Sequence, residues 1–160
     1  LALRPRLIIA DEPTTALDVT VQDQVLRLLL ARRDADGVAI MLVTHDLGVV
    51  SEVCDSVSVL YAGRTIETQA TQDLFSAPRH PYTRALIGCL PSLDPNAPPP
   101  VAIAGEVPIP GRLPAGCAFH PRCPRASALC AQTAPVAQSG TGKGAIACHH
   151  PHLVSQRLAG

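Results

Sequence analysis

The chain has 160 residues, which is enough for one ordinary domain with a buried core. Its 13 Lys and Arg balance 13 Asp and Glu, and aromatic residues make up only 2% with no Trp, so neither charge nor base stacking favours nucleic acid as a partner. No apolar run approaches the roughly 20 residues of a membrane-spanning helix.

The composition changes along the chain. Twelve of the 16 prolines, but only seven of the 26 charged residues, lie at or beyond Pro91. Before that point, apolar runs alternate with helical patterns at the spacing of βαβ units, which predicts a parallel sheet covered by helices. We therefore expect an α/β region over 1–90, a Pro-rich linker over 91–114 and an irregular, cysteine-rich extension over 115–160.

The first predicted strand is a short apolar run at 7–10 that ends in two carboxylates, Asp11 and Glu12, before Pro13 stops it. A run without polar residues suits a central parallel strand that is buried on both faces. Ligands of such sheets bind beyond the carboxyl ends of the strands, so the two acids lie where chemistry is usually placed. The alternative is a pair of loop carboxylates that begins the next helix.

A helix and a second strand follow. The apolar positions of residues 19–35 recur at helical spacing, which predicts an amphipathic covering helix with Asp18 as its N-cap. After a turn, residues 38–43 are expected to form a second buried strand, and His45 follows its end. A lone histidine at such a place is more often a packed or capping residue than a functional one.

Two strings in this region carry a family resemblance. The sequence DEPTTALD at 11–18, followed one helix and one strand later by VTHD at 43–46, resembles the ATPase subunits of ATP-binding cassette (ABC) transporters. The resemblance implies the P-loop NTPase fold and the hydrolysis of ATP with Mg²⁺. It assigns roles to four residues: Mg²⁺ held through water by Asp11, the attacking water oriented or deprotonated by Glu12, the partner cassette contacted by the loop of Asp18, and the γ-phosphate reached by His45.

Two other motifs of that family are missing. The phosphate-binding loop, GxxxxGK followed by Ser or Thr, supplies backbone N–H groups and a Lys to the phosphates, and it occurs nowhere in the chain. The Ser-Gly-Gly signature of the family is absent too. Both normally precede the first strand, and the chain opens on Leu1 rather than Met. We therefore expect the C-terminal part of a cassette subunit, which would bind ATP poorly by itself.

The next region narrows the subfamily. Residues 56–61 and 64–67 flank a turn, which predicts a hairpin, and residues 71–76 are predicted as a short helix. The string HPY at 80–82 begins another helix, with its proline at the favoured first position. Together with LF at 74–75 and CLP at 89–91, it resembles the oligopeptide and dipeptide importer ATPases, whose C-terminal extension begins with this motif.

The extension is too poorly periodic to build a core, so we expect a staple to replace one. Four of its cysteines follow the spacing C-x5-C-x6-C-x17-C: Cys117, Cys123, Cys130 and Cys148. Four thiolates suit a tetrahedral zinc or an iron–sulfur cluster, although the spacings of zinc ribbons and ferredoxins are both absent. The alternative is four unrelated or disulfide-bonded cysteines, and a cytosolic location disfavours disulfides.

The resemblance to the importer ATPases implies a 4Fe-4S cluster on these four cysteines, with Zn²⁺ as the second choice. His149, His150 and His152 are candidate substitute ligands. Cys54 and Cys89 fall in helical patterns, where we expect them to be buried small apolar residues.

These expectations combine into an ATP-binding and ATP-hydrolysing subunit of an ABC importer for oligopeptides or dipeptides. The resemblance implies a second ABC ATPase subunit, two transmembrane permease subunits and an extracellular substrate-binding protein as partners, and a peripheral location on the cytoplasmic face of the membrane. The competing hypothesis is a non-catalytic metal-binding interaction module, in which the strand acids only cap helices. The choice among dipeptide, oligopeptide, nickel and other cargoes such as sugars lies with the binding protein and the permease.

Overall fold

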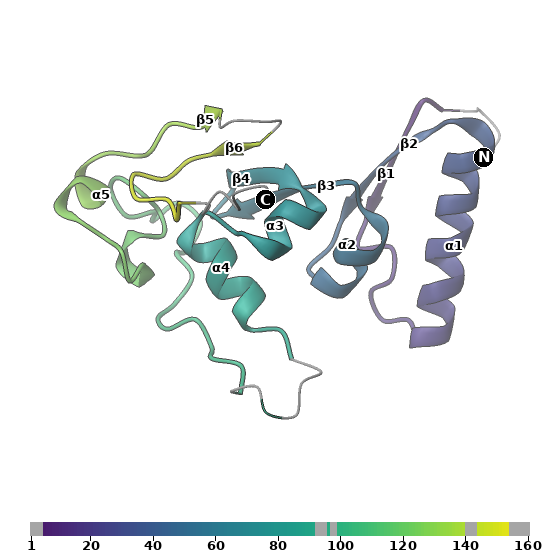
Figure 1. Cartoon of the computed structure of the whole chain (residues 1–160), viewed down its shortest axis with the longest axis horizontal. Helices are drawn as coiled ribbons and strands as arrows, with labels where there is room; N and C mark the ends of the chain where they lie inside the picture. Colours follow the sequence, from purple (N-terminus) through teal and green to yellow (C-terminus); the bar gives the residue numbers. More distant parts are fainter. Residues whose placement is uncertain (1–4, 92–95, 97–98, 140–143, 154–160) are drawn as a thin grey trace, which may run out of the picture. The chain divides into compact units, whose positions relative to one another are not determined.

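The computed structural model describes residues 5–91, 96, 99–139 and 144–153. It is a mixed α/β protein that divides into two compact units, Leu1–Cys54 and Asp55–Gly160, and Figure 1 follows the chain through both. Part of the predicted linker, residues 92–95 and 97–98, lies outside the described residues. The second unit runs across the composition change at Pro91.

The first unit contains two strands and two helices: β1 (Leu7–Asp11), α1 (Val19–Asp36), β2 (Ala39–Val43) and α2 (Leu47–Val53). The strands pair in parallel, with Leu7 opposite Ala39 and Asp11 opposite Val43. Helix α1 is the crossover between them, and it ends at Gly37, whose left-handed φ of 64° suits a glycine. The predicted strand, helix, strand order is confirmed.

The prediction that both strands are buried on two faces is wrong for this chain. Exposure alternates along each strand, and the side chains of Ile9 and Met41 are 64% and 55% exposed. The few buried side chains of the unit lie on helices α1 and α2, as Leu26 and Val50 do, or just before β2, as Val38 does. One apolar face of the strand pair therefore has no covering layer among the described residues.

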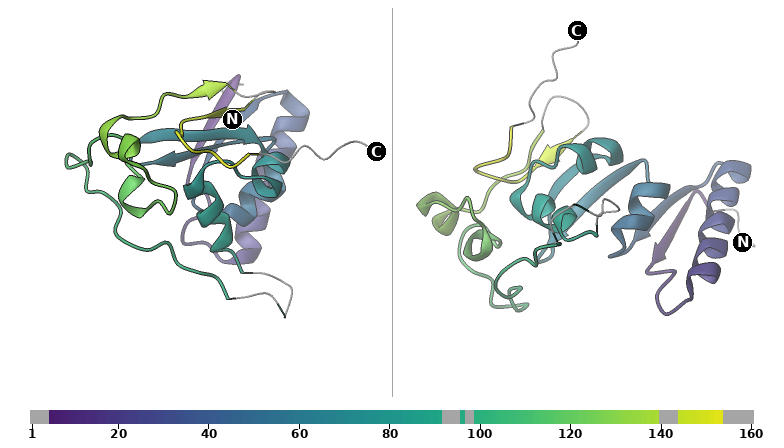
Figure 2. Two further views of the ribbon diagram at one scale, coloured as in Figure 1. Left: turned by 60° about the vertical axis from the view of Figure 1, so that its left-hand side comes forward. Right: turned by 60° about the horizontal axis from the view of Figure 1, so that its bottom comes forward.

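The second unit is built on an antiparallel sheet in the order β3-β4-β6-β5. Its elements are β3 (Ser56–Tyr61), β4 (Arg64–Ala70), α3 (Thr71–Ser76), α4 (Pro81–Gly88), the 3-10 turn η1 (His120–Arg122), α5 (Ala128–Gln132), β5 (Gln138–Ser139) and β6 (Ala145–Ile146). The predicted hairpin and both predicted helices are confirmed. Strand β6 was not anticipated; it runs antiparallel beside β4 and so ties the extension to the hairpin (Figure 2).

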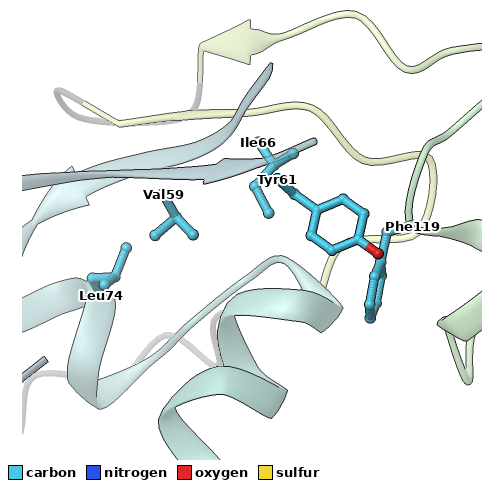
Figure 3. Close-up of a cluster of buried hydrophobic side chains, with 5 residues drawn as sticks. All are labelled: Val59, Tyr61, Ile66, Leu74 and Phe119. Carbon is cyan, nitrogen blue, oxygen red and sulfur yellow. The ribbon is translucent and has the colours of Figure 1, made fainter. Parts of the chain in front are cut away.

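The core of this unit contains a residue of the extension. Five buried side chains form it: Val59, Tyr61, Ile66, Leu74 and Phe119 (Figure 3). Phe119 is 1% exposed, and its ring lies 5.2 Å from that of Tyr61 and 5.3 Å from that of Tyr82, edge to face in both pairs. The expectation that the extension contributes no core is therefore wrong, because the ring of Phe119 is buried among side chains of the hairpin.

Cys54 and Cys89 also differ from expectation. They are half-buried residues just beyond α2 and α4, where each backbone N–H caps the helix end. The thiol of Cys89 donates to the carbonyl oxygen of Val101 at 3.2 Å. The helical pattern predicted both cysteines to lie within helices, whereas each lies one residue beyond the helix end.

Candidate functional site

Glu12 and His45 meet at the carboxyl ends of β1 and β2. Because the strands are parallel neighbours with Asp11 opposite Val43, the residues after each strand leave the sheet at the same edge. The backbone N–H of Glu12 donates to the carbonyl oxygen of Val43 at 2.8 Å. Nδ1 of His45 lies 2.9 Å from Oε1 of Glu12. The structure thus brings two of the residues singled out by the sequence into direct contact.

The carboxylate of Glu12 is held at both oxygens. The hydroxyl of Thr15 donates to Oε2 at 2.7 Å, while His45 contacts Oε1. The hydrogen bond from Thr15 is the main reason why the pKa of Glu12 lies below its usual value, and the bond from His45 adds to it. The backbone of Glu12 has a φ of 43°, a left-handed conformation that is uncommon outside glycine and clusters at functional sites.

The neighbouring aspartates have different surroundings. Asp11 ends β1 and is exposed. Asp18 accepts a hydrogen bond from the backbone N–H of Val21 at 2.9 Å and is the predicted N-cap of α1. Asp46 caps α2 in the same way, accepting from the backbone N–H of Gly48 at 2.8 Å. Capping accounts for Asp18 within this chain, and its contact with a partner cassette stays a prediction.

This edge of the sheet is open to solvent. The side chain of His45 is 78% exposed and that of Glu12 is 44% exposed. An ionised carboxylate is a pure hydrogen-bond acceptor that can orient or deprotonate a water molecule, and an adjacent imidazole can donate to an anionic oxygen. The pair therefore has the groups that hydrolysis of a phosphate ester or anhydride requires. Thr15 is the residue that sequence reasoning missed as a positioning group, although it lies in the string that carries the resemblance.

A pocket in the second unit gathers all four cysteines of the extension. Its lining includes Cys117, Cys123, Cys130, Cys148, His80, Phe119, His120, His149 and His150. All four cysteines are free thiols. The backbone N–H of Cys117 donates to the carbonyl oxygen of Cys130 at 2.8 Å, and a side chain at Gly116, whose φ is 68°, would collide with that oxygen. Glycine is therefore required where the chain enters the pocket.

Burial raises the pKa of the thiols of Cys117 and Cys123 and raises that of Cys148 to about 11. For Cys148, negative charge on Cys117, Cys123 or Cys130 would raise its pKa in the same direction. At neutral pH the thiols of Cys117, Cys123 and Cys148 are protonated, and any metal that binds them must displace their protons.

Among the described residues, no three His, Cys, Asp or Glu side chains stand together as a group that could hold a single metal ion. Two of the histidines considered as substitute ligands have other partners. Nε2 of His149 lies 2.9 Å from the carbonyl oxygen of Thr133, and Nε2 of His150 lies 2.7 Å from the hydroxyl of Ser127. The pocket thus offers four thiols as donors, but they are not drawn together as a tetrahedral zinc with Zn–S bonds of ~2.3 Å would draw them.

Glu67 and His80 are polar residues of this unit that sequence reasoning did not select as functional; each is 1% exposed. Glu67, on β4, accepts from the backbone N–H groups of Arg79 at 2.8 Å and His80 at 3.0 Å, and from the Gln69 amide at 2.7 Å. Nδ1 of His80 accepts from the backbone N–H of Tyr82 at 3.0 Å and caps α4. Burial lowers the pKa of His80 to about 4, so its ring is neutral.

Known proteins match the chain over nearly its whole length. The family described as "Oligopeptide/dipeptide transporter, C-terminal region" matches residues 66–130. The oligopeptide transport ATP-binding protein OppD of Salmonella typhimurium is 46% identical over 151 residues, 94% of this chain and 45% of that protein. The probable D,D-dipeptide transport ATP-binding protein DdpD of Escherichia coli is 49% identical over 147 residues, 92% of this chain and 45% of that protein.

The dipeptide transport ATP-binding protein DppF of Haemophilus influenzae is 43% identical over 94% of this chain and 46% of its own length. Among solved structures, CbiO1 of Clostridium perfringens, part of the ABC transporter complex CbiONQ, aligns with 46% of this chain and 29% of its own, at 33% identity and a TM-score of 0.42.

The motifs and these matches support an ABC-type ATP-binding protein. The chain is similar to the oligopeptide and dipeptide transport ATP-binding proteins, and it spans slightly less than half the length of the curated relatives it matches. The resemblance noted in the sequence is thereby confirmed, and nothing in the matches supports the metal-binding interaction module as an alternative function. No helix within the described parts of the chain has the length and apolar character needed to cross a membrane.

Proposed function

We propose that this chain is part of the ATP-hydrolysing subunit of an ABC importer for oligopeptides or dipeptides. The relatives that support this function are oligopeptide and dipeptide transport ATP-binding proteins. The observation that carries it is the contact of 2.9 Å between Glu12 and His45 at the common edge of two parallel strands. In this proposal the γ-phosphate of ATP faces that edge.

Glu12 orients or deprotonates the attacking water. Its lowered pKa keeps it ionised at neutral pH, and Thr15 holds the carboxylate so that one geometry is preferred. Nδ1 of His45 faces this carboxylate, so in the imidazolium form Nε2 carries a second N–H that can donate to the γ-phosphate. The carboxylate of Asp11 offers the hard oxygen ligands that Mg²⁺ prefers, and Mg²⁺ would neutralise the developing phosphate charge.

The sequence contains no phosphate-binding loop, so residues outside it must complete the nucleotide site. We propose that the exposed apolar face of β1 and β2, which includes Ile9 and Met41, packs against that other part of the cassette. The proposed partners are a second ABC ATPase subunit near the loop of Asp18, two transmembrane permease subunits and an extracellular substrate-binding protein. The complex would place this chain on the cytoplasmic face of the membrane.

In the extension we propose a 4Fe-4S cluster bound by Cys117, Cys123, Cys130 and Cys148, with Zn²⁺ as the competing occupant. The support is that all four thiols line one pocket without the tight grouping of a single-ion site. A four-iron cluster presents four separate irons and so accepts more widely spaced thiolates than one zinc does. When bound, the cluster would cross-link the segments that carry the cysteines.

The hydrolytic function is tested by joining this chain to the phosphate-loop segment of a close relative and measuring phosphate release from ATP. We expect hydrolysis that depends on Mg²⁺ and is lost in Glu12→Gln. A joined, folded chain that binds ATP but releases no phosphate would overturn the assignment.

The cluster is tested by iron and zinc analysis of protein purified without oxygen. We expect about four irons per chain, as the 4Fe-4S stoichiometry requires, and a visible absorption band. Changing any one of the four cysteines to Ser should bleach the protein, while Cys54→Ser, outside the pocket, should not. A content of one zinc per chain would show that Zn²⁺ occupies the site instead of the cluster. A protein without bound metal would contradict both occupants.

A further inference from the structure

His80 combines burial with a place on the wall of the cysteine pocket. Its side chain is 1% exposed, and the residue lines the same pocket as the four cysteines. It stands at the N-cap of α4, where Glu67 holds its backbone N–H at 3.0 Å. Its ring centroid lies 6.0 Å from that of Phe119, a core residue that lines the pocket too. The residue is therefore held at its backbone, and its ring lies beside an aromatic ring of the core.

The hydrogen bonding of His80 decides which nitrogen carries the proton. Nδ1 accepts from the backbone N–H of Tyr82 at 3.0 Å, so it has no hydrogen of its own. In a neutral imidazole the proton is then on Nε2, which makes Nε2 a donor. This buried atom has no hydrogen-bond partner among the residues that the structure describes. A buried donor without an acceptor is rare and marks a place where an acceptor is expected.

The other pocket histidines are engaged elsewhere. Nδ1 of His120 contacts the carbonyl oxygen of Cys117 at 2.9 Å, and Nε2 of His150 contacts Ser127 at 2.7 Å. The cysteine sulfurs are weak acceptors while they are protonated thiols, and they become anionic acceptors when a metal group displaces the protons. An anionic sulfur in this pocket would supply the acceptor that Nε2–H of His80 lacks.

We propose that Nε2–H of His80 donates a hydrogen bond to a sulfur of the iron–sulfur group held by the four cysteines, either a cysteine thiolate or a cluster sulfide, and raises its reduction potential. A donor at a sulfur stabilises the more negative, reduced state over the oxidised one, and hydrogen bonds to the sulfurs are among the levers that set the potential. This inference rests on the proposed cluster. It makes His80 a positioning and tuning residue that is not itself a ligand.

Two substitutions separate the two nitrogens of the ring. In His80→Asn the amide oxygen takes the place of Nδ1, so the cap of α4 is kept and the donor to the pocket is lost. In His80→Gln the amide nitrogen reaches the position of Nε2, so the donor is kept and the cap is weakened. Gln72→Asn on α3 is the control, because Gln72 is exposed and is not among the residues that line the pocket.

The experiment measures the midpoint potential and the visible spectrum of the intact protein, purified without oxygen, for the wild type and the three variants. We expect reduction of His80→Asn to be about tenfold less favourable than that of the wild type, which is ~59 mV for a one-electron couple. His80→Gln and Gln72→Asn should stay close to the wild type. Loss of iron from His80→Asn alone would also support the proposal, since that variant keeps the cap.

Three results would overturn the inference. Equal midpoint potentials in His80→Asn and the wild type would show that His80 makes no hydrogen bond to a sulfur. Equal changes of the potential in the Asn and Gln variants would show that His80 has only a structural role. In both cases an iron-loaded wild type leaves the cluster proposal standing. A wild-type protein without iron would instead overturn the cluster, and this inference with it.

Discussion

Oε1 of Glu12 and Nδ1 of His45 lie 2.9 Å apart although 33 positions separate the two residues in the chain. The parallel pairing of β1 and β2 accounts for this, because it places Asp11 opposite Val43 and sends both following loops out at the same edge. Thr15 completes the group by holding the second carboxylate oxygen. The predictions for this edge, which we propose to be catalytic, refer to this chain joined to a phosphate-loop segment.

Glu12→Gln should abolish ATP turnover while leaving ATP binding nearly intact. The amide can still form hydrogen bonds but cannot accept the proton of the attacking water, and loss of a general base costs roughly 10²–10⁴-fold in rate. Phosphate release and nucleotide affinity are the two measurements. Glu52→Gln on α2 removes the same charge from another exposed site and should change neither. Unchanged turnover in Glu12→Gln would show that another group activates the water.

Thr15→Val should shift the acid limb of the pH profile of kcat to higher pH. The hydrogen bond from Thr15 is the largest cause that lowers the pKa of Glu12, so its loss lets that pKa rise and Glu12 becomes protonated at higher pH as the solution is acidified. Thr15→Ser keeps the hydroxyl and should restore the wild-type profile. A fall in rate without movement of the acid limb would mean that Thr15 only supports the loop.

His45→Ala should lower kcat by about 10²–10³-fold, the loss seen when one charge-stabilising donor is removed from an active site. Packing offers little alternative, because the side chain is 78% exposed and its removal opens no cavity. Single-turnover kinetics should place the loss on the chemical step, with ATP affinity changed much less. A loss below tenfold would argue that His45 does not contact the γ-phosphate.

Glu67→Gln should destabilise the second unit by about 2–3 kcal/mol, since a buried carboxylate that accepts from two backbone N–H groups is replaced by an amide whose NH₂ must face one of them. The chain has no Trp, and its two tyrosines, Tyr61 and Tyr82, both lie in this unit, so tyrosine fluorescence during urea unfolding reports on this unit alone. Glu106→Gln, at an exposed position, is the control and should change the unfolding free energy little.

The stability of the second unit should fall as the pH is lowered from about 6.5 to about 4. Burial is the main cause that lowers the pKa of His80 from 6.5 to about 4 in the folded state. Between these values the unfolded chain binds more protons than the folded one, so the contribution of His80 is present above pH 6.5 and is lost on acidification, by about 3 kcal/mol in total.

Urea unfolding across this pH range measures the effect. His80→Asn removes the titrating group and keeps the cap, so its stability should depend less on pH. His149→Asn should retain the wild-type slope. Identical slopes for His80→Asn and the wild type would assign the acid sensitivity to other groups.

The sequence by itself determined the local structure of this protein. The apolar runs predict β1 and β2 because they are too short for helices, and the helix boundaries follow from side chains that act within one turn: Asp18 at the start of α1 and the proline of the HPY string at the start of α4. The strings at 11–18, 43–46 and 80–82 were enough to indicate the family resemblance, because a motif consists of residue types at fixed spacing.

The tertiary structure determined which residues from distant parts of the chain are in contact. The contact of Glu12 with His45 depends on the strand register. The exposure of Ile9 and Met41 depends on the number of layers that pack on the sheet. The burial of Phe119 depends on a hairpin that is distant in the sequence, as the hydrogen bond between Arg122 and Tyr61, 61 positions apart, also shows. From the sequence, Glu67 is predicted only as a strand residue and His80 only as the start of a helix, and nothing indicates that both are buried. Local propensity depends on neighbours along the chain, whereas burial, pKa and an unpaired donor depend on side chains brought together from distant segments, and no window of sequence contains both partners.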